Sequence, residues 1–377
     1  MKNIRSVISA TSQYRGRCSY YNSRFYSTSY TITDVKPFSE IPGPFRIPLL
    51  GNLYLYKLGI YDVTKYQLVL KRLHEEFGPI VRQDIGLKTV IHLFDPESVK
   101  IVYEAEGKYP HVEPLQETVQ LYRKHRNLSL GLGNLNGEEW YRLRSAVQQM
   151  MLRPAEVHYY LPLITSVAGD FIERLHRKKD ENGEVPNLRD EIAKWSLESS
   201  GMVCFETRLG SFNGGTSEKE AERIISANKN IFYLSALLKF SLQLYKYLPS
   251  PKWKKLVKEE DYFYGVGGGY VDETITKIME LKKQGKMDVD KYRFISYLLS
   301  KPDLSIEDVK IIVLSLFGDG LSTTTPTLLF NLYCLATNPD VQQKAYEEVS
   351  SLMKREPITV ELLNQMTYLK AVIKETF

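Results

Sequence analysis

The sequence predicts a mainly helical protein with a small β-sheet region towards its N-terminal end. Helical spacing of apolar residues continues almost without interruption from about residue 137 to the end of the chain. One Val- and Ile-rich stretch, residues 80–94, has a Gly-Leu-Lys turn near its middle and predicts a β-hairpin. No run of about 18 or more apolar residues occurs, so the sequence predicts no transmembrane helix.

The net charge of the chain lies in its first 33 residues. The 377 residues are 43% hydrophobic and 25% charged, with a formal net charge of +5. Residues 1–33 hold five Lys or Arg, seven Ser and no Asp or Glu, whereas the rest is neutral. This composition is typical of a mitochondrial transit peptide with cleavage near Tyr26, and the alternative is a disordered basic tail. A neutral remainder argues against nucleic-acid binding, which requires a basic field.

The next segments predict a connector, a helix, the hairpin and a second helix. Residues 41–52 contain three prolines, which fix φ and remove backbone donors, so a stiff extended connector is expected. Residues 61–77 have helical spacing and end at a Gly-Pro pair. After the hairpin, Asp95 as N-cap and Pro96 at the first helical position predict another helix.

The remainder is predicted to consist of helices joined by polar loops. Gly265–Gly269 lacks the third glycine, the preceding strand and the following Gly-Lys pair of nucleotide-binding loops, so we interpret it as a loosened helix or a turn. The predicted helices span residues 138–152, 155–178, 189–205, 218–233, 253–283, 290–299, 305–337, 339–354, 359–365 and 367 onward.

The helix predicted for residues 305–337 has an unusual middle. At about 1.5 Å per residue it would span roughly 50 Å, and it is apolar around most of its circumference, as a central buried helix should be. Its middle contains two glycines, three consecutive threonines and Pro326. Pro326 has no N–H for the carbonyl of Ser322, so a groove lined by hydrogen-bonding groups and a kink that only fits neighbouring helices are equally supported.

These segments together resemble the cytochrome P450 family of haem-thiolate monooxygenases. Asp319–Glu348 resembles the oxygen-binding helix of the family and the helix that follows it. The resemblance covers residues 38–377, so residues 34–377 are expected to form one monooxygenase domain with a cytochrome P450-like fold. The other matching segments are Pro42–Asn52 (proline-rich hinge), Asn136–Arg144 (W-x-x-x-R helix), Trp195–Ser199 with Arg208–Gly210 (mitochondrial branch, arthropod-like members) and Tyr368–Thr376 (start of the E-x-x-R helix).

Three residues are expected to bind the cofactor that the resemblance implies. Trp140 and Arg144 are four residues apart on one helix face, and an indole N–H with a guanidinium suits a carboxylate. The resemblance implies that this carboxylate is a haem propionate; without it, a surface Trp–Arg stack is favoured. Gly320 is expected to let the ligand approach the helix backbone.

The expected catalytic residues are Thr323, Asp319 and Ser322. Thr323 matches the distal threonine of the family, which hydrogen-bonds dioxygen and helps to deliver protons. The family usually has an acid immediately before this threonine, but Ser322 stands there. Asp319, one turn earlier on the same face, is either a substitute for that acid or a solvent-facing side chain.

Three residues near the end of the chain have expected structural or partner roles. Glu375 matches the glutamate of E-x-x-R, which forms a buried ion pair with an arginine in the family. Lys370 and Lys374 match lysines that bind an acidic, adrenodoxin-like ferredoxin in mitochondrial members, and charge steering would speed that encounter. The alternative for both lysines is an ordinary solvated helix face.

The iron ligand of the family, a cysteine in a glycine-rich loop, is not found in this sequence. Cys18 lies in the predicted transit peptide, and Cys204 and Cys334 are expected to be small buried hydrophobes within helices. No metal ligand is therefore assigned. The arginine partner of Glu375 would be residue 378, so we expect a C-terminally truncated and inactive product, in which a buried unpaired Glu375 costs about 3–5 kcal/mol.

The resemblance implies a mitochondrial monooxygenase on the matrix side of the inner membrane. Haem would activate O2, with electrons from NADPH through a ferredoxin, and one oxygen atom would enter a lipophilic, steroid-like substrate. Residues 129–137 resemble the variable loop over the substrate pocket, and the apolar run within 231–265 is expected to contact the inner membrane peripherally. The alternatives are a non-catalytic helical protein that binds lipid or ferredoxin, and a haem protein that has lost the monooxygenase cycle.

Overall fold

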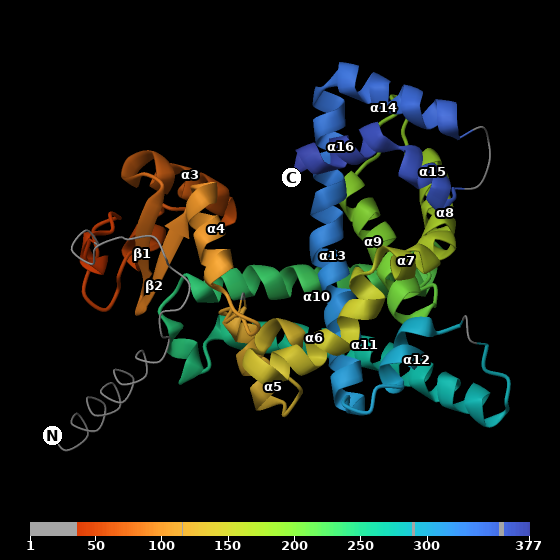
Figure 1. The fold of residues 1–377 in the computed structure, drawn as a ribbon, viewed down its shortest axis with the longest axis horizontal. Coiled ribbons are helices and arrows are strands. Elements are labelled where there is room, and N and C mark those ends of the chain that lie inside the picture. Colours follow the sequence, from red (N-terminus) through yellow and green to blue (C-terminus); the bar gives the residue numbers. More distant parts are fainter. Residues whose placement is uncertain (1–35, 115, 289–290, 354–357) are drawn as a thin grey trace.

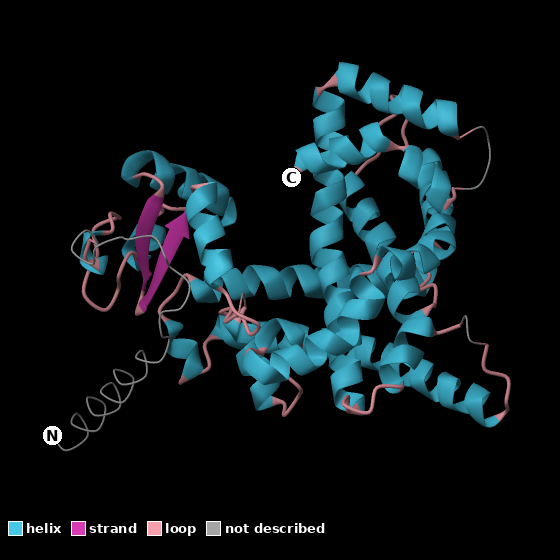
Figure 2. Ribbon diagram, in the orientation of Figure 1, coloured by secondary structure: helices cyan, strands magenta, loops and turns pink. Residues whose placement is uncertain are grey.

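Helices dominate the fold, which is described by a computed structural model over residues 36–114, 116–288, 291–353 and 358–377. Across these ranges a single antiparallel pair of strands forms the only sheet (Figure 2). The predicted mainly α fold with a small β-sheet region is therefore confirmed. The predicted transit peptide, residues 1–33, lies outside the described residues. Within the described ranges, no helix has the length and apolar character needed to cross a membrane.

The N-terminal part forms a unit of one hairpin and short helices (Figure 1). The predicted hairpin is confirmed: Ile80 pairs with Leu93, and the chain turns at Gly86, whose φ of +64° suits glycine. As predicted, Asp95 caps the next helix, because its carboxylate accepts a hydrogen bond from the Ser98 N–H at 2.9 Å. The elements are α2 (Leu53–Lys57), α3 (Tyr66–Phe77), β1 (Ile80–Ile85), β2 (Lys88–Leu93) and α4 (Pro96–Ala105).

Asn52 holds the proline-rich connector against the hairpin. Its side-chain amide donates to the Phe45 carbonyl at 2.8 Å, and its Oδ1 accepts from the Asp84 N–H at 2.7 Å. Asn52 is buried, so both hydrogen bonds are shielded from water. The connector therefore follows a fixed path along β1 without forming a regular helix or strand.

The middle of the chain is a series of helices. The loosening predicted at Gly265–Gly269 is wrong, because α11 passes through these residues unbroken. A Cβ atom on Gly267 would lie 2.6 Å from Leu314 Cδ2 of α13, so this glycine permits close helix packing. The helix α5 is absent from the sequence prediction. The elements are α5 (Glu117–His125), α6 (Gly137–Leu152), α7 (Pro154–Val157), α8 (Leu161–Lys178), α9 (Leu188–Phe205), α10 (Gly215–Lys239), α11 (Pro251–Lys283) and α12 (Arg293–Leu299).

Helix α13 crosses the molecule and carries much of the core (Figure 1). It begins with a capping box: Ser305 Oγ accepts from the Asp308 N–H at 3.0 Å, and the Asp308 carboxylate accepts from the Ser305 N–H at 3.2 Å. Its buried Val313 and Phe317 pack among α9, α10, α11 and α12. The last elements are α13 (Ile306–Thr337), α14 (Pro339–Leu352), α15 (Val360–Gln365) and α16 (Thr367–Thr376).

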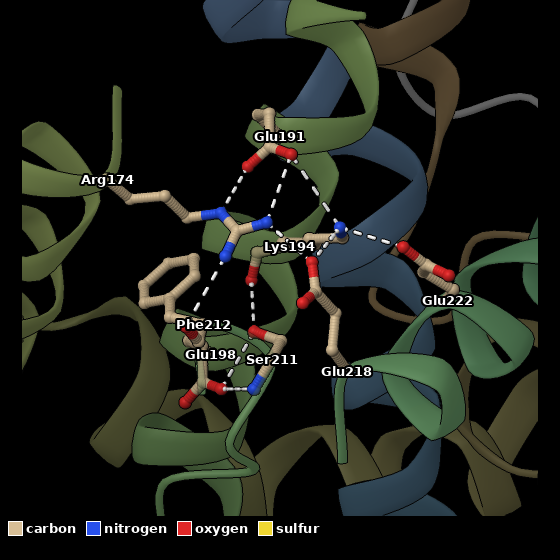
Figure 3. A network of polar contacts seen from close by, with 8 residues as sticks. All are labelled: Arg174, Glu191, Lys194, Glu198, Ser211, Phe212, Glu218 and Glu222. Carbon is tan, nitrogen blue, oxygen red and sulfur yellow. Dashed lines mark hydrogen bonds and ion pairs between the residues drawn. The ribbon is translucent and has the colours of Figure 1, made fainter. Parts of the chain in front are cut away.

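A buried network of charged side chains joins α8, α9 and α10 (Figure 3). The Arg174 guanidinium pairs with Glu191 and Glu218, and the Lys194 ammonium lies 2.6 Å from the Glu218 carboxylate. The hydrogen bonds from Lys194 and Arg174 hold the pKa of Glu218 below its ordinary value. Because Arg174 and Lys194 are both buried, each cation depends on these carboxylates for its stabilisation.

Candidate active site

A cavity of about 290 Å³ lies beside the middle of α13, and all three residues predicted to be catalytic line it. Asp319, Ser322 and Thr323 form part of one wall. Helices α5, α10 and α11 supply much of the rest. The lining combines polar and apolar side chains. Its further polar members are Gln116, Arg123, Asn134, Asn228, Glu260, Tyr264 and Ser315, and its apolar members are Val119, Ile231, Phe232, Phe263 and Leu314.

The hydroxyl groups of Ser322 and Thr323 point back along α13. Thr323 Oγ1 donates to the Asp319 carbonyl at 2.7 Å, and Ser322 Oγ donates to the same carbonyl at 3.2 Å. Both hydroxyls keep their capacity to accept a hydrogen bond. Helix α13 continues through Pro326. A second cavity of about 470 Å³, lined by Ser322, Thr325 and Pro326, lies where the groove was predicted.

The environment of Asp319 favours the neutral form of its carboxyl group. Asp319 keeps open surface towards the cavity, but the protein around it displaces water and raises its pKa, while the Arg123 guanidinium opposes this rise. The structure thus brings Asp319 to the same cavity wall as Thr323, one helical turn away. Its predicted role as the substitute for the missing acid at Ser322 stays a prediction.

Arg123 forms the centre of a polar cluster that the sequence analysis missed. It is 5% exposed, and its guanidinium donates to Tyr264 Oη, to the Leu130 carbonyl and to Ser315 Oγ, the last at 3.2 Å. These three acceptors are all uncharged. In the sequence, Arg123 belongs to a basic run that resembles a solvated surface, so no local signal indicates its burial.

Glu260 is the second residue of this cluster that the sequence analysis missed. It is 2% exposed, it lines the cavity, and its buried Oε1 has no hydrogen-bond partner within the described ranges. Burial raises its pKa to about 7, and the Arg123 charge limits this rise. Each of the other buried Asp, Glu, Lys and Arg side chains in the described part has a hydrogen-bond or ion-pair partner, which makes Glu260 exceptional.

Gly320 has a packing function in this structure. A Cβ atom at this position would lie 2.2 Å from Ser200 Oγ of α9, and the Gly320 carbonyl accepts a hydrogen bond from Ser196 Oγ at 2.9 Å. The glycine therefore allows α9 to approach α13 closely. The packing alone explains why a glycine stands here. The expected role of Gly320 in letting a ligand approach the helix backbone stays a prediction.

Trp140 and Arg144 lie on α6, away from the lining of the cavity, and both are partly buried. Within the described ranges neither the Trp140 indole N–H nor the Arg144 guanidinium has a hydrogen-bond or ion-pair partner in the protein, and no cation–π contact forms the Trp–Arg stack that was the alternative. Two free donors on one helix face suit an anionic carboxylate. The residues present therefore fit the propionate side of a haem.

The expected burial of Glu375 is wrong. Glu375 lies in the last turn of α16 with its side chain exposed, so water solvates the carboxylate and the cost of a buried unpaired charge does not arise. Lys370 and Lys374 are also exposed on α16, and Lys370 Nζ donates to Asn364 Oδ1 at 3.2 Å. The two lysines are thus available to a partner, as their predicted role requires.

The two cysteines of the described part differ in burial. Cys204 is completely buried in α9, and this burial raises the pKa of its thiol, so it stays a neutral thiol as expected of a small hydrophobe. Cys334 is only partly buried in α13. Neither sits in a glycine-rich loop, so neither fits the axial thiolate position of a haem.

Comparison with known proteins defines the class to which this long-helix fold belongs. The family model for cytochrome P450 matches residues 41–377, so the chain belongs to the cytochrome P450 family. The family expected from the sequence is therefore confirmed.

Among its relatives, the chain is 40% identical to the probable cytochrome P450 CYP44 of Caenorhabditis elegans, over 93% of this chain and 70% of that protein. It is 33% identical to the probable mitochondrial cytochrome P450 301a1 of Drosophila melanogaster, over 94% of this chain and 66% of the relative. It is 30% identical to the mitochondrial 1,25-dihydroxyvitamin D(3) 24-hydroxylase of Rattus norvegicus, over 90% of this chain and 64% of that protein. The chain thus spans about two thirds of the length of these relatives, and it is of the mitochondrial class within the family.

Proposed function

We propose that this protein is a haem-dependent monooxygenase that inserts one oxygen atom from O2 into a lipophilic substrate. The observation that carries the proposal is the placement of Asp319, Ser322 and Thr323 on one wall of a cavity that five apolar side chains also line. Apolar lining with a few polar groups is what a lipophilic substrate requires, because desolvation binds it and the polar groups orient it. The cytochrome P450 match over residues 41–377 supports the same reaction class.

In this proposal α6 holds the cofactor and α13 manages protons. Trp140 and Arg144 bind a haem propionate with their free N–H donors. When bound, haem supplies the activation of O2. Thr323 Oγ1 offers an acceptor beside the cavity, and Asp319, whose pKa is raised by burial, would exchange a proton with groups on the same helix face. The axial thiolate is not supplied by Cys204 or Cys334, and no step is derived from them.

The remaining parts of the proposal concern partners and location. Mitochondrial relatives such as cytochrome P450 301a1 support a mitochondrial location, with residues 1–33 as transit peptide. The exposed Lys370 and Lys374 support a ferredoxin partner that relays electrons from NADPH. Exposed Leu244 and Leu248, near the end of α10, support peripheral contact with the inner membrane, from which a steroid-like substrate would enter.

A second candidate is a non-catalytic helical protein that binds lipid or ferredoxin. It requires only surfaces already described: the exposed Lys370 and Lys374 for a ferredoxin, and the exposed Leu244 and Leu248 for lipid. An absorption spectrum distinguishes the two candidates. This chain and any longer product of the same transcript are expressed with haem precursor, and each product is then reduced and treated with carbon monoxide. A thiolate-type Soret band in either product supports the monooxygenase. Its absence from both would refute that function and leave the binding protein.

A further inference from the structure

The cavity beside α13 has a polar end and an apolar remainder. Glu260 and Tyr264 are four residues apart on α11, so they lie on one helix face, and Tyr264 accepts a hydrogen bond from Arg123 at 2.8 Å. Arg123 also donates to Ser315 of α13. These residues therefore form one polar end of the cavity. The apolar side chains that line the same cavity are Val119, Ile231, Phe232, Phe263 and Leu314.

The unused hydrogen-bonding capacity at this end includes an acceptor on Glu260, besides the hydroxyl protons of Tyr264 and Ser315. Arg123 already donates to three uncharged groups of the protein, whereas the buried Oε1 of Glu260 has no donor within the described ranges. A buried polar group without a partner is costly, so a ligand that donates a hydrogen bond to Glu260 would remove this cost. A ligand that only accepts hydrogen bonds would leave it in place.

The charges at this end favour an uncharged ligand. Glu260, when ionised, would repel a carboxylate or phosphate, and the Arg123 guanidinium, which limits the rise of the Glu260 pKa, favours that ionised form. The same guanidinium would repel an amine. A neutral hydroxyl group is therefore the donor that meets no like charge, and it also accepts a hydrogen bond in return.

We infer that Glu260 determines substrate specificity: it accepts a hydrogen bond from the hydroxyl group of a neutral, lipophilic alcohol whose apolar part extends along α13 towards Thr323. Ser315 and Thr323 are eight residues apart on the same helix, which corresponds to about 12 Å along its axis. The oxidised carbon would thus lie about 12 Å from the hydroxyl group, the length of an extended chain of about ten carbons. The inference rests on the proposed monooxygenase function. The binding of the alcohol to Glu260, which can be measured alone, requires no haem.

Isothermal titration calorimetry of the 377-residue chain with matched ten-carbon probes tests the inference. The probes are 1-decanol, decyl methyl ether, decanoate and decylamine, so that only the alcohol is both neutral and a donor. At pH 8, above the pKa of about 7 of Glu260, we expect 1-decanol to bind about tenfold or more tightly than each of the others, because a hydrogen bond to a charged group is worth that much. Equal binding of alcohol and ether, or tighter binding of the anion or the amine, would overturn the inference.

Variants of Glu260 test whether this residue causes the preference for the alcohol. In Glu260→Leu the advantage of the alcohol over the ether should fall to about twofold or less, and Glu260→Gln, which keeps an oxygen acceptor, should retain part of it. Glu259→Gln is the matched control, because Glu259 is also buried but pairs with Arg223 at 2.6 Å and does not line the cavity. An unchanged preference in Glu260→Leu, or an equal loss in Glu259→Gln, would contradict the assignment. If Glu260→Leu does not fold, Glu260→Gln and Glu259→Gln still test the assignment, because only Glu260→Gln should reduce the preference for the alcohol.

This binding result and the proposed monooxygenase function fail separately. A missing Soret band with a clear preference for the alcohol would reject only the enzyme. A Soret band without that preference would reject only the role of Glu260.

Discussion

The buried carboxyl group of Glu260 should make the stability of the fold decrease as the pH rises. Its pKa is about 7 in the folded protein against 4.5 for an ordinary glutamate. Since each unit of pKa corresponds to about 1.4 kcal/mol, the difference corresponds to about 3 kcal/mol. The folded state binds the proton more tightly than the unfolded state, so this contribution is fully present below pH 4.5 and is lost as the pH rises through 7.

The groups around Glu260 set the size of this effect. Burial is the main cause of the raised pKa; the Arg123 guanidinium of α5 lowers it, and the neighbouring Asp261 raises it. Across the cavity, Tyr264 of α11 and Asp319 of α13 also face Arg123. Because Arg123 stays charged over the whole pH range, it does not add a transition of its own.

The assay is urea denaturation of the wild type and of Glu260→Gln at several pH values between 5 and 8. The free energy of unfolding of the variant, relative to that of the wild type, should increase by about 2–3 kcal/mol over this range. Glu218→Gln is the control. Because Lys194 and Arg174 hold the pKa of Glu218 below its ordinary value, its transition lies below pH 5 and its difference from wild type should be constant. A constant difference for Glu260→Gln would refute the reasoning.

Three further predictions concern packing, the buried network and the exposed apolar side chains. Arg174→Met should lower the free energy of unfolding by about 3–5 kcal/mol in urea denaturation, because it leaves buried carboxylates without their cation; a loss under 1 kcal/mol would contradict this. Gly267→Ala should destabilise by about 1–3 kcal/mol, since its Cβ meets Leu314, while Gly268→Ala, with open space, should stabilise by up to about 1 kcal/mol in the same assay. Replacing Leu244 and Leu248 by Ser should weaken sedimentation with phosphatidylcholine–cardiolipin vesicles at least severalfold, and unchanged binding would exclude this contact.

Local sequence signals predicted those parts of the fold that depend on neighbouring residues. Asp95 followed by Pro96 predicted a helix start, and Gly86 marked the hairpin turn, because caps and turns are decided within a few residues. Gly267 was misinterpreted for the opposite reason. Nothing near it in the sequence shows that α13 passes so closely that a side chain would not fit.

The candidate site was predictable only on α13. Asp319 and Thr323 share one helix, so their spacing alone places them on one face. Arg123 and Glu260 come from α5 and α11, and each lies in a charged run that is typical of a solvated surface. Their burial results from the packing of three helices, which one sequence does not show.

The unpartnered polar groups of this chain are better evidence of ligand sites than the motifs are. The other buried charged side chains in the described part of this fold have hydrogen-bond or ion-pair partners, as in the network of Arg174 and Lys194 (Figure 3). Under such pairing, a buried carboxylate without a donor at Glu260 costs stability that a neutral side chain would not. Because Glu260 also lines a cavity, a ligand that donates a hydrogen bond to it would offset this cost.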